Sequence, residues 1–539
     1  MSDIKENNIA PFHFDKTGRP VYTVTSRRKE EGKADVIYKM PDRIIPVIFL
    51  PGVMGSNLKN DKHQSIWKAD SIASMLSWTT KSASQRKKLL DPSKTSVDSD
   101  GAIEPEGEEE RQLFRSRRER GWGEVAAMSY GTFLVWLQQA LNDHRIMMNN
   151  KISQNGKKTL REELLDKVLH AEIGESPLTK EEVALSYKYF FPVHAIGYNW
   201  LQSNTDSAGF VDVKIKKIIN DYQADGRKCE KVILVTHSMG GLVARFYSEL
   251  LAGQNGEKYI LGIVHGVMPD LGAPMAYKRM KAGEAGTTGW VIGSNGAEMT
   301  AVLAQSPGPL QLLPGTGYGK GWLHIDGMAQ RLPLKDPYNE IYTKRSVWWA
   351  LCEERFINPD NKLMDKIQLD KDWDEYDFLI NNKVKSFIES LNRRYHKNTF
   401  AFYGNDGNTY PTYANLHWKD ISSDKTNKKY RSQTSSEGVI FYPPTVYNKT
   451  VRIAGLITEN DGNIYRKYTL LPPADAGDGT VPVSAAAIRA PHVKALLGLS
   501  IDHEGAYKNE HTQESRWFTL RSIIKIAQQV NSTGLAYVS

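Results

Sequence analysis

The segment VTHSMGGLVARF, residues 235–246, constrains the fold of this chain more than any other stretch. An apolar run, KVILV (231–235), leads into it with the character of a buried strand, and GLVARFYSELLA (241–252) is compatible with a helix. Ser238 therefore stands at an abrupt turn from strand to helix. Such a turn is either a tight connection in an α/β domain or an elbow that exposes a nucleophilic serine.

Further strand-like runs alternate with helical patterns along the chain. They are RIIPVIFLPGVMGSN (43–57), FFPVHAIGYNW (190–200), YILGIVHGV (259–267), NTFAFYGND (398–406) and ALLGLSI (495–501). Strands that alternate with helices indicate a mostly parallel sheet with helices on both of its faces.

A serine hydroxyl is a weak nucleophile at neutral pH, so it needs a base, and the base needs an orienting group. After a serine elbow, the acid and then the histidine follow along the chain. Asp478 lies in AGDGTVP, just after a strand-like segment, and His503 directly follows the apolar run 495–501. We therefore predict Ser238 as nucleophile, Asp478 as acid and His503 as base.

Other residues compete for two of these roles. Asp475 is the near alternative for the acid, and His492 and His511 are alternatives for the base. His237 adjoins the serine, but its side chain should point away along the elbow, so we expect it to pack beside the site or support it.

Acyl transfer also needs two donors for the developing oxyanion. One predicted donor is the amide of Met239, the residue after the nucleophile. The other should come from LPGVMGSN (50–57), where Gly52 and Gly55 allow a close approach of the backbone. The elbow departs from the usual G-x-S-x-G pattern because Thr236 replaces its first glycine.

These features predict an α/β-hydrolase fold, a mostly parallel sheet with helices on both faces, carrying large cap insertions. The predicted core consists of residues 43–58, 191–275, 398–410 and 465–539. The other predicted segments are a polar N-terminal extension (1–42), two cap insertions (59–190 and 276–397) and a turn-rich insertion (411–464).

Composition narrows the class of protein. No apolar run approaches the about 18 residues of a membrane span, and the polar start MSDIKENNIAPFHFDKTGRP has no apolar stretch. We therefore expect synthesis in the cytoplasm without a conventional signal peptide.

The two cysteines fit a reducing compartment. No Cys/His spacing suggests zinc, so neither a metal nor a cofactor is expected. The net charge of +8 is mild for 539 residues, and the basic runs are local and carry no interleaved aromatic repeat, so no nucleic-acid partner is expected.

Several segments together resemble the lipases and acyltransferases similar to lecithin:cholesterol acyltransferase and lysosomal phospholipase A2. They are PGVMGSN, THSMGGLVAR, SPGPLQLLP, FAFYGNDGNTYPTY, GDGTVPVSA and IDHEGAY, in this order. The resemblance implies that Ser238, Asp478 and His503 form a catalytic triad. It also implies that the amides of Val53 and Met239 form the oxyanion hole.

Two segments, RGWGEVAAMSYGTFL (120–134) and DLGAPMAYKRMKAG (270–283), also resemble bacterial lipase effectors of the type VI secretion system. Asp270 stands where the lecithin:cholesterol acyltransferase group often has a histidine. This second resemblance implies export by that system to the periplasm or membrane of a target cell. It further implies a membrane phospholipid substrate, a cognate immunity protein and a secretion-spike protein as partners.

The expected function is a serine lipase or phospholipase that hydrolyses acyl esters of membrane glycerophospholipids through an acyl-enzyme, as a secreted antibacterial effector. One alternative is a lipid acyltransferase with an alcohol acceptor, because exclusion of water by the cap decides the acceptor. Another is a catalytically inactive hydrolase fold that binds a membrane or a partner. The complete Ser, Asp and His set counts against that alternative.

The first insertion also suggests a surface for lipid. Apolar side chains gather before a set of basic ones: Ile72, Met75, Leu76 and Trp78, then Lys81, Arg86, Lys87 and Lys88. On a helix this arrangement pairs an apolar patch with a basic flank and predicts contact with anionic lipid. The alternative is an ordinary amphipathic helix packed on the core.

Overall fold

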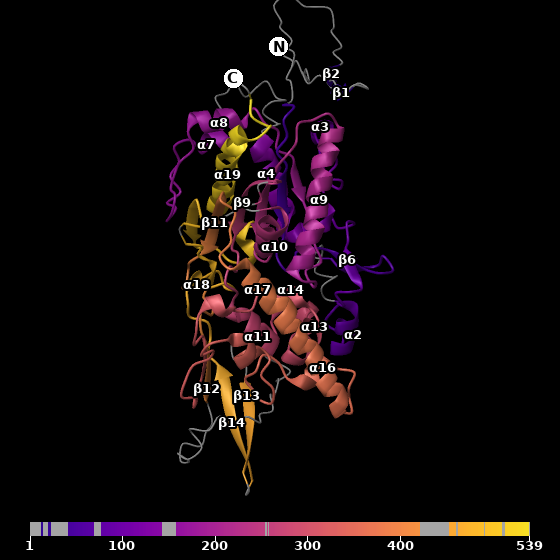
Figure 1. Ribbon diagram of the computed structural model, residues 1–539, viewed down its shortest axis with the longest axis vertical. Coiled ribbons are helices and arrows are strands. Elements are labelled where there is room, and N and C mark those ends of the chain that lie inside the picture. Colours follow the sequence, from indigo (N-terminus) through magenta and orange to yellow (C-terminus); the bar gives the residue numbers. More distant parts are fainter. Residues whose placement is uncertain are drawn as a thin grey trace, which may run out of the picture.

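The computed structural model describes residues 12–14, 20–22, 41–68, 77–142, 158–253, 256, 258–420, 452–459, 462–489, 491–508 and 513–537. The molecule is elongated, with an α/β core in the upper half of Figure 1 and a mostly helical part with a second sheet in the lower half. Within the described ranges, no helix is both long enough and apolar enough to cross a membrane.

Six strands form the central sheet, and each of their pairings is parallel. They are β3 (Val47–Leu50), β7 (Val193–Ala195), β8 (Val232–His237), β9 (Ile260–Gly266), β11 (Thr399–Gly404) and β15 (Ala495–Leu499). Their spatial order is β15-β11-β9-β8-β3-β7. Almost every residue of these strands is buried, as expected for a parallel sheet covered on both faces. The predicted α/β-hydrolase fold is confirmed.

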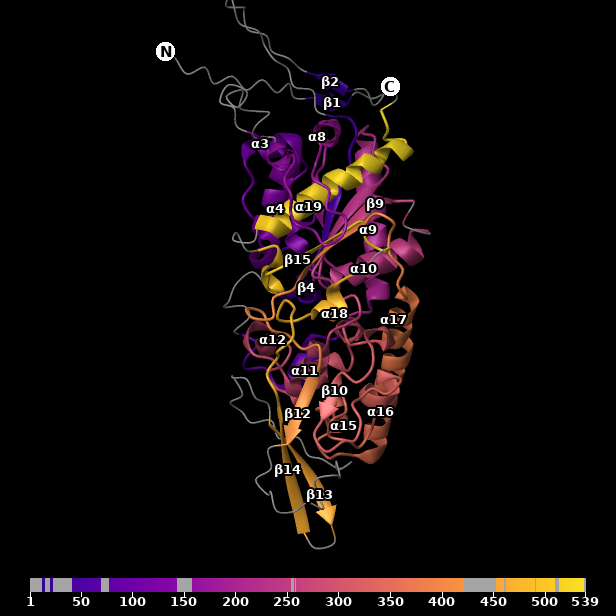
Figure 2. The same cartoon turned by 90° about the vertical axis from the view of Figure 1, so that its left-hand side faces the viewer.

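Four helices cover this sheet (Figure 2). Helices α9 (Asn204–Ala224) and α10 (Gly240–Phe246) pack together on one face, and α4 (Ala127–Asn142) and α19 (Gln513–Ala527) on the other. Helix α9 turns a stripe of residues spaced three and four apart toward the sheet, among them Val211, Ile215 and Ile219.

Helix α4 belongs to the predicted first cap insertion, but it packs against β7 and α19. Its Phe133 ring lies 5.7 Å from the ring of Phe49 on β3 and 4.4 Å from that of Tyr507. This helix therefore contributes to the core, and the division of the chain into core and cap stays a prediction.

A second sheet lies at the other end of the molecule. Its order is β10 (Leu323–Ile325), β12 (Leu416–Asp420), β14 (Gly462–Leu470) and β13 (Arg452–Glu459). The hairpin β13–β14 projects from the bottom of Figure 1. Its two strands are antiparallel, and their register pairs Glu459 with Gly462.

The remaining helices of the lower half are α11 (Pro274–Ala282), α12 (Gly286–Val291), α13 (Gly296–Leu303), α14 (Pro307–Leu310), α15 (Glu354–Ile357), α16 (Lys366–Leu379), α17 (Ser386–Leu391) and α18 (Val483–Ala486). Other short elements are β1 (Phe12–Phe14), β2 (Pro20–Tyr22), β4 (Leu58–Asn60), β5 (Ser65–Trp67), β6 (Thr95–Val97), α2 (Ala83–Leu89), α3 (Glu108–Leu113), α7 (Leu160–Glu163) and α8 (Lys180–Ser186). Helix α2 packs against α13 in the lower half of Figure 1.

Helix α2 corrects the prediction of a lipid-binding patch. Trp78 and Arg86 are both 2% exposed, so neither reaches a membrane surface. The Arg86 guanidinium donates to the backbone oxygens of Trp78 at 2.8 Å and of Trp290 at 2.5 Å. The predicted contact with lipid is therefore wrong for these two residues, and the alternative of a helix packed on the protein holds.

The basic residues that follow are also engaged with protein. Lys87 donates to the carbonyl of Ile357 at 2.6 Å, and Lys88 lies 3.0 Å from the carboxylate of Asp360. The predicted apolar residues Ile72, Met75 and Leu76 lie outside the described residues.

The acidic run 104–110 and the arginine-rich run 111–123 form a buried ion network. Arg117 donates two hydrogen bonds to the carboxylate of Glu110, at 2.9 and 2.6 Å, and Arg120 donates a third at 2.9 Å. Arg120 also donates to the carbonyl of Val193 at 2.9 Å. The network therefore fixes this segment to the edge strand of the central sheet.

We expect Glu110→Gln to lower the free energy of unfolding by about 3 kcal/mol, because two buried guanidinium groups lose their countercharge. Urea unfolding followed by tryptophan fluorescence measures the change. Asp360→Asn is the matched control, since its partner Lys88 is 70% exposed and the loss should stay below about 1 kcal/mol. Equal losses in the two variants would contradict the importance of the buried network.

Candidate active site

The turn after β8 places Ser238 in a conformation that side chains seldom adopt. Its φ angle is 50°, in the left-handed region, and such a residue costs on the order of 1–3 kcal/mol unless the surroundings hold it. Helix α10 begins two residues later, at Gly240. A Cβ atom on Gly240 would lie 2.5 Å from the carbonyl oxygen of Pro51, so only glycine lets the elbow approach the loop after β3. The sharp turn predicted from the sequence is present.

Thr236, the departure from the usual elbow pattern, has a specific partner. Its hydroxyl lies 2.9 Å from Nδ1 of His265, the residue opposite it on β9. Burial, together with the nearby charges of Arg245 and His396, lowers the pKa of His265 to about 3. The imidazole is therefore neutral, and the pair satisfies a polar side chain inside the sheet.

The structure brings together the three residues predicted as a triad. Nε2 of His503 lies 2.8 Å from the Ser238 hydroxyl, and its Nδ1 lies 2.7 Å from Oδ2 of Asp478. Oδ1 of Asp478 accepts hydrogen bonds from the amides of Thr480 at 2.9 Å and Val481 at 2.6 Å. Because the carboxylate accepts the Nδ1 proton, Nε2 is left to accept the proton of the serine hydroxyl.

Backbone contacts fix the acid and the base at the carboxyl edge of the sheet. The amide of His503 donates to the carbonyl of Asp478 at 2.9 Å. A Cβ atom on Gly404, the last residue of β11, would lie 2.5 Å from Cβ of Asp478. Glycine at the end of this strand therefore allows the loop carrying Asp478 to lie directly on the sheet.

The competing residues lie elsewhere or have other partners. Asp475 accepts hydrogen bonds from the amides of Ala414 at 2.8 Å and Asn415 at 3.3 Å, so it holds a loop together. His492 is exposed, with its ring 5.1 Å from that of Tyr395. His511 lies outside the described residues.

Asp270, which stands where related chains often have a histidine, is part of a buried cluster. It accepts hydrogen bonds from Arg245 at 2.5 Å and from the hydroxyl of Tyr395 at 2.6 Å. Its carboxylate therefore balances the charge of the buried Arg245, which lies on helix α10 after the elbow.

His237 takes part in a chain of buried hydrogen bonds that sequence reasoning did not find. Its Nε2 lies 2.8 Å from the carbonyl of His503, and its Nδ1 lies 2.9 Å from the hydroxyl of Tyr130. The amide of Gly52 donates to the same hydroxyl at 3.2 Å. Burial, and the proximity of His503, lower the pKa of His237 to about 3, so the ring is neutral.

The direction of this chain follows from the donors available. The carbonyl of His503 can only accept, so Nε2 of His237 carries the proton and Nδ1 accepts from the Tyr130 hydroxyl. Tyr130 in turn accepts from Gly52. The chain therefore links the loop after β3 with the segment that carries His503. Tyr130 lies inside the segment RGWGEVAAMSYGTFL, but nothing in its local pattern indicates this role.

The predicted oxyanion donors, Val53 and Met239, directly follow Gly52 and Ser238 in the sequence. A Cβ atom on Gly52 would lie 3.1 Å from Cβ of Ser238, so the loop after β3 rests against the serine. The Gly52 amide is occupied by Tyr130. Among the described residues, the amides of Val53 and Met239 donate to no other protein group, and their role as oxyanion donors stays a prediction.

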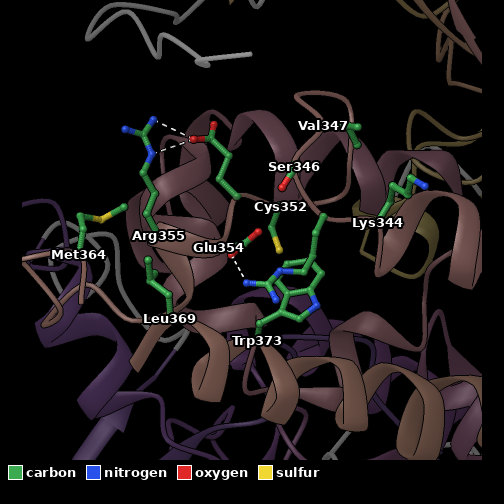
Figure 3. Close-up of a pocket in the computed structure, with 11 residues that line it drawn as sticks. Lys344, Ser346, Val347, Cys352, Glu354, Arg355, Met364, Leu369 and Trp373 are labelled. Carbon is green, nitrogen blue, oxygen red and sulfur yellow. Dashed lines mark hydrogen bonds and ion pairs between the residues drawn. The ribbon is translucent and has the colours of Figure 1, made fainter. Parts of the chain in front are cut away.

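A cavity of about 250 Å³ lies in the lower half, apart from these residues (Figure 3). Its lining includes Cys352, Trp373 and Arg345, whose guanidinium pairs with Glu354 at 2.5 Å and Asp370 at 2.6 Å. None of the three predicted triad residues lines it, so it is not the space in which Ser238 would meet an ester.

The family model for lecithin:cholesterol acyltransferase matches residues 178–488, more than half of the chain. This chain belongs to the lecithin:cholesterol acyltransferase family. The matched segment includes Ser238 and Asp478 and ends before His503. The family predicted from the sequence motifs is therefore confirmed.

One solved structure shares the fold of this chain. A chain in the crystal structure of the Tle4–Tli4 complex is similar to this one, with a TM-score of 0.69 and 27% identity, over 90% of this chain and 98% of that chain. Phospholipase PlaB from Legionella pneumophila aligns at 13% identity over 76% of this chain and 62% of that one, with a TM-score of 0.21. A search of curated proteins gives no match.

We expect Tyr130→Phe to slow the reaction of Ser238 with a fluorophosphonate probe by about tenfold or more. The substitution leaves the buried Gly52 amide and Nδ1 of His237 without their partner, at roughly 1–3 kcal/mol each. Mass spectrometry of the modified protein follows the rate.

The matched control for this prediction is Tyr277→Phe. Tyr277 is also buried, and its hydroxyl donates to the carbonyl of Trp349 at 2.7 Å in the lower half. That variant should lose stability but react with the probe at the rate of the original protein. An unchanged rate in Tyr130→Phe would show that the chain does not position the site.

Proposed function

We propose that this protein is a serine carboxylic-ester hydrolase, a lipase or phospholipase acting on membrane glycerophospholipids. The observation that carries the proposal is the hydrogen-bonded series Ser238–His503–Asp478 at the carboxyl edge of the sheet. Membership of a lipid-acyl family supports a lipid ester as the substrate.

In the proposed reaction, the Ser238 oxygen attacks the ester carbonyl while Nε2 of His503 takes the hydroxyl proton. Asp478 stabilises the resulting imidazolium, and the amides of Val53 and Met239 bind the oxyanion. His503 then gives its proton to the departing alcohol, leaving an acyl-enzyme. Water attacks this ester as His503 takes its proton, and His503 then returns a proton to the Ser238 oxygen as the fatty acid leaves.

Transfer of the acyl group to an alcohol is the second candidate function. It uses the same first half-reaction and differs only in the acceptor that enters after the alcohol has left. The family is named for an acyltransferase, which supports acyl transfer as a candidate. A catalytically inactive fold is the third candidate, and the aligned hydrogen bonds of His503 count against it.

We further propose a role as an antibacterial effector exported by the type VI secretion system. The support is the resemblance of segments 120–134 and 270–283 to such effectors, together with the similarity to a chain of the Tle4–Tli4 complex. That complex holds two proteins, which favours a cognate immunity protein as a partner of this chain. The secretion-spike partner rests on the sequence resemblance alone.

Contact with the membrane requires an apolar surface, and the lower half exposes one at the start of α16. Leu363 is 94% exposed and Ile367 is 81% exposed, with the exposed cations Lys362 and Lys366 beside them. Exposed apolar side chains flanked by lysines suit the headgroup region of an anionic bilayer. We propose this tip, in place of α2, as the lipid contact.

We expect Ser238→Ala to abolish ester hydrolysis, by a factor on the order of 10⁴ to 10⁶, with the fold intact. Purified protein is incubated with defined glycerophospholipids, a neutral ester and an alcohol acceptor, and the products are identified by mass. Circular dichroism checks the fold. Residual turnover within about tenfold of the original protein would place the nucleophile elsewhere, and acyl-alcohol products would indicate transfer.

A carboxylate pair provides the control for the triad assignment. Asp478→Asn should cripple turnover because His503 loses the acceptor that fixes its tautomer. Asp475→Asn removes a carboxylate three residues away and should affect turnover only mildly. The reverse order would contradict Asp478 as the acid.

We expect the double variant Leu363→Gln, Ile367→Gln to bind anionic vesicles several-fold more weakly and to hydrolyse vesicle lipid more slowly. Hydrolysis of a short soluble ester should stay the same, because the substitutions leave the triad untouched. Vesicle sedimentation measures binding. The control is Val213→Gln on α9, which is 66% exposed on the core. Equal weakening in the control would remove the tip as a specific contact.

A further inference from the structure

Two histidines meet on neighbouring strands of the second sheet. Strands β10 and β12 are parallel, and their register places His324 directly opposite His417. Side chains of directly paired residues lie on the same face of a sheet. Their imidazole rings are stacked, with centroids 4.0 Å apart and planes 27° from parallel.

A carboxylate completes the group. Asp326 follows β10, and its Oδ1 lies 2.7 Å from Nε2 of His417. Its Oδ2 accepts a hydrogen bond from the amide of Asp420 at 3.0 Å, which orients the carboxylate. One ligand atom from each of His324, Asp326 and His417 lies within 4.8 Å of the other two.

We propose that His324, Asp326 and His417 bind one divalent transition-metal ion of the zinc class. Two imidazole nitrogens and one carboxylate oxygen are a ligand set that zinc accepts, with water in the fourth position. Calcium needs six to eight oxygen ligands, which this group does not supply. The side chains of His417 and Asp326 are 33% and 32% exposed, so an ion and its water can enter from solvent.

Binding requires only a small movement. Ligand distances of about 2.0–2.2 Å in a tetrahedral arrangement separate two donors by roughly 3.3 Å. His417 and Asp326 therefore move apart by a fraction of an ångström, which side-chain rotation can provide. The ion replaces the proton between them.

The charges around the group partly favour and partly oppose a cation. Partial burial, with the neighbouring His417 and Arg331, lowers the pKa of His324, which favours the neutral imidazole that binds metal. The Arg331 charge opposes a dication, and the Asp326 carboxylate offsets it. We therefore expect weaker binding than at a fully buried structural zinc site.

The ion would connect two segments that are far apart in the sequence. The end of β14 is held to the same strand as His417, because the amide of Leu471 donates to the carbonyl of His417 at 2.9 Å. Residue 471 directly follows β14, and the same stretch of chain continues to Asp475 and Asp478. The ion would thus stabilise the sheet from which the chain returns to the proposed triad, without taking part in ester chemistry.

The test uses the full chain without a polyhistidine tag, stripped of metal with EDTA. Zn²⁺ is titrated by calorimetry, and Co²⁺ is titrated while visible absorption reports nitrogen and oxygen ligation. We expect one ion per chain and a rise in the unfolding midpoint of about 2 °C or more at saturating Zn²⁺. Absence of Zn²⁺ binding, or binding of Ca²⁺ in preference to Zn²⁺, overturns the proposal.

Variants locate the ion. His324→Gln, His417→Gln and Asp326→Asn should each weaken Zn²⁺ binding at least tenfold and abolish the shift in midpoint. His170→Asn is the control, because His170 is exposed and outside the group. Circular dichroism in EDTA confirms that each variant is folded. Zn²⁺ binding that survives in all folded variants overturns the assignment to these residues.

Discussion

The two hydrogen bonds of the His503 imidazole are the interaction on which the arrangement of the site depends. They join a serine on the elbow after β8 to a carboxylate that follows the last strand of the second sheet in the chain. Both partners are almost completely buried, so each would be destabilising without the imidazole between them. The parallel sheet makes this possible, because it ends β8, β11 and β15 at one edge.

A second series of hydrogen bonds holds the backbone of the same histidine. It runs from the Gly52 amide through Tyr130 and His237 to the backbone of His503. The loop proposed to supply an oxyanion donor and the segment that carries the base are therefore positioned by common partners. A displacement of α4, which carries Tyr130, would therefore shift both the loop after β3 and the segment that carries His503.

Much of this could be predicted from the sequence where local pattern decides the structure. Apolar runs gave the strands, and chain order singled out Ser238, Asp478 and His503, which the fold brings into contact. A sequence pattern does not show what an amphipathic helix packs against. For this reason the pattern predicts Arg86 at a surface, whereas the structure buries it. Sequence patterns also could not show strand register, which alone places His324 beside His417, 93 positions later in the sequence. The role of Tyr130 could not be predicted for the same reason, because its hydrogen-bond partners come from distant segments.

The pair formed by Thr236 and His265 has a consequence for anyone comparing or redesigning such chains. A glycine at 236 would restore the common elbow motif, yet it would remove the hydroxyl that Nδ1 of His265 contacts inside the sheet. The two positions should therefore change together among homologues, with threonine accompanying histidine and glycine accompanying an apolar residue. A consensus design that altered the first position alone would carry an orphaned imidazole into the centre of the protein.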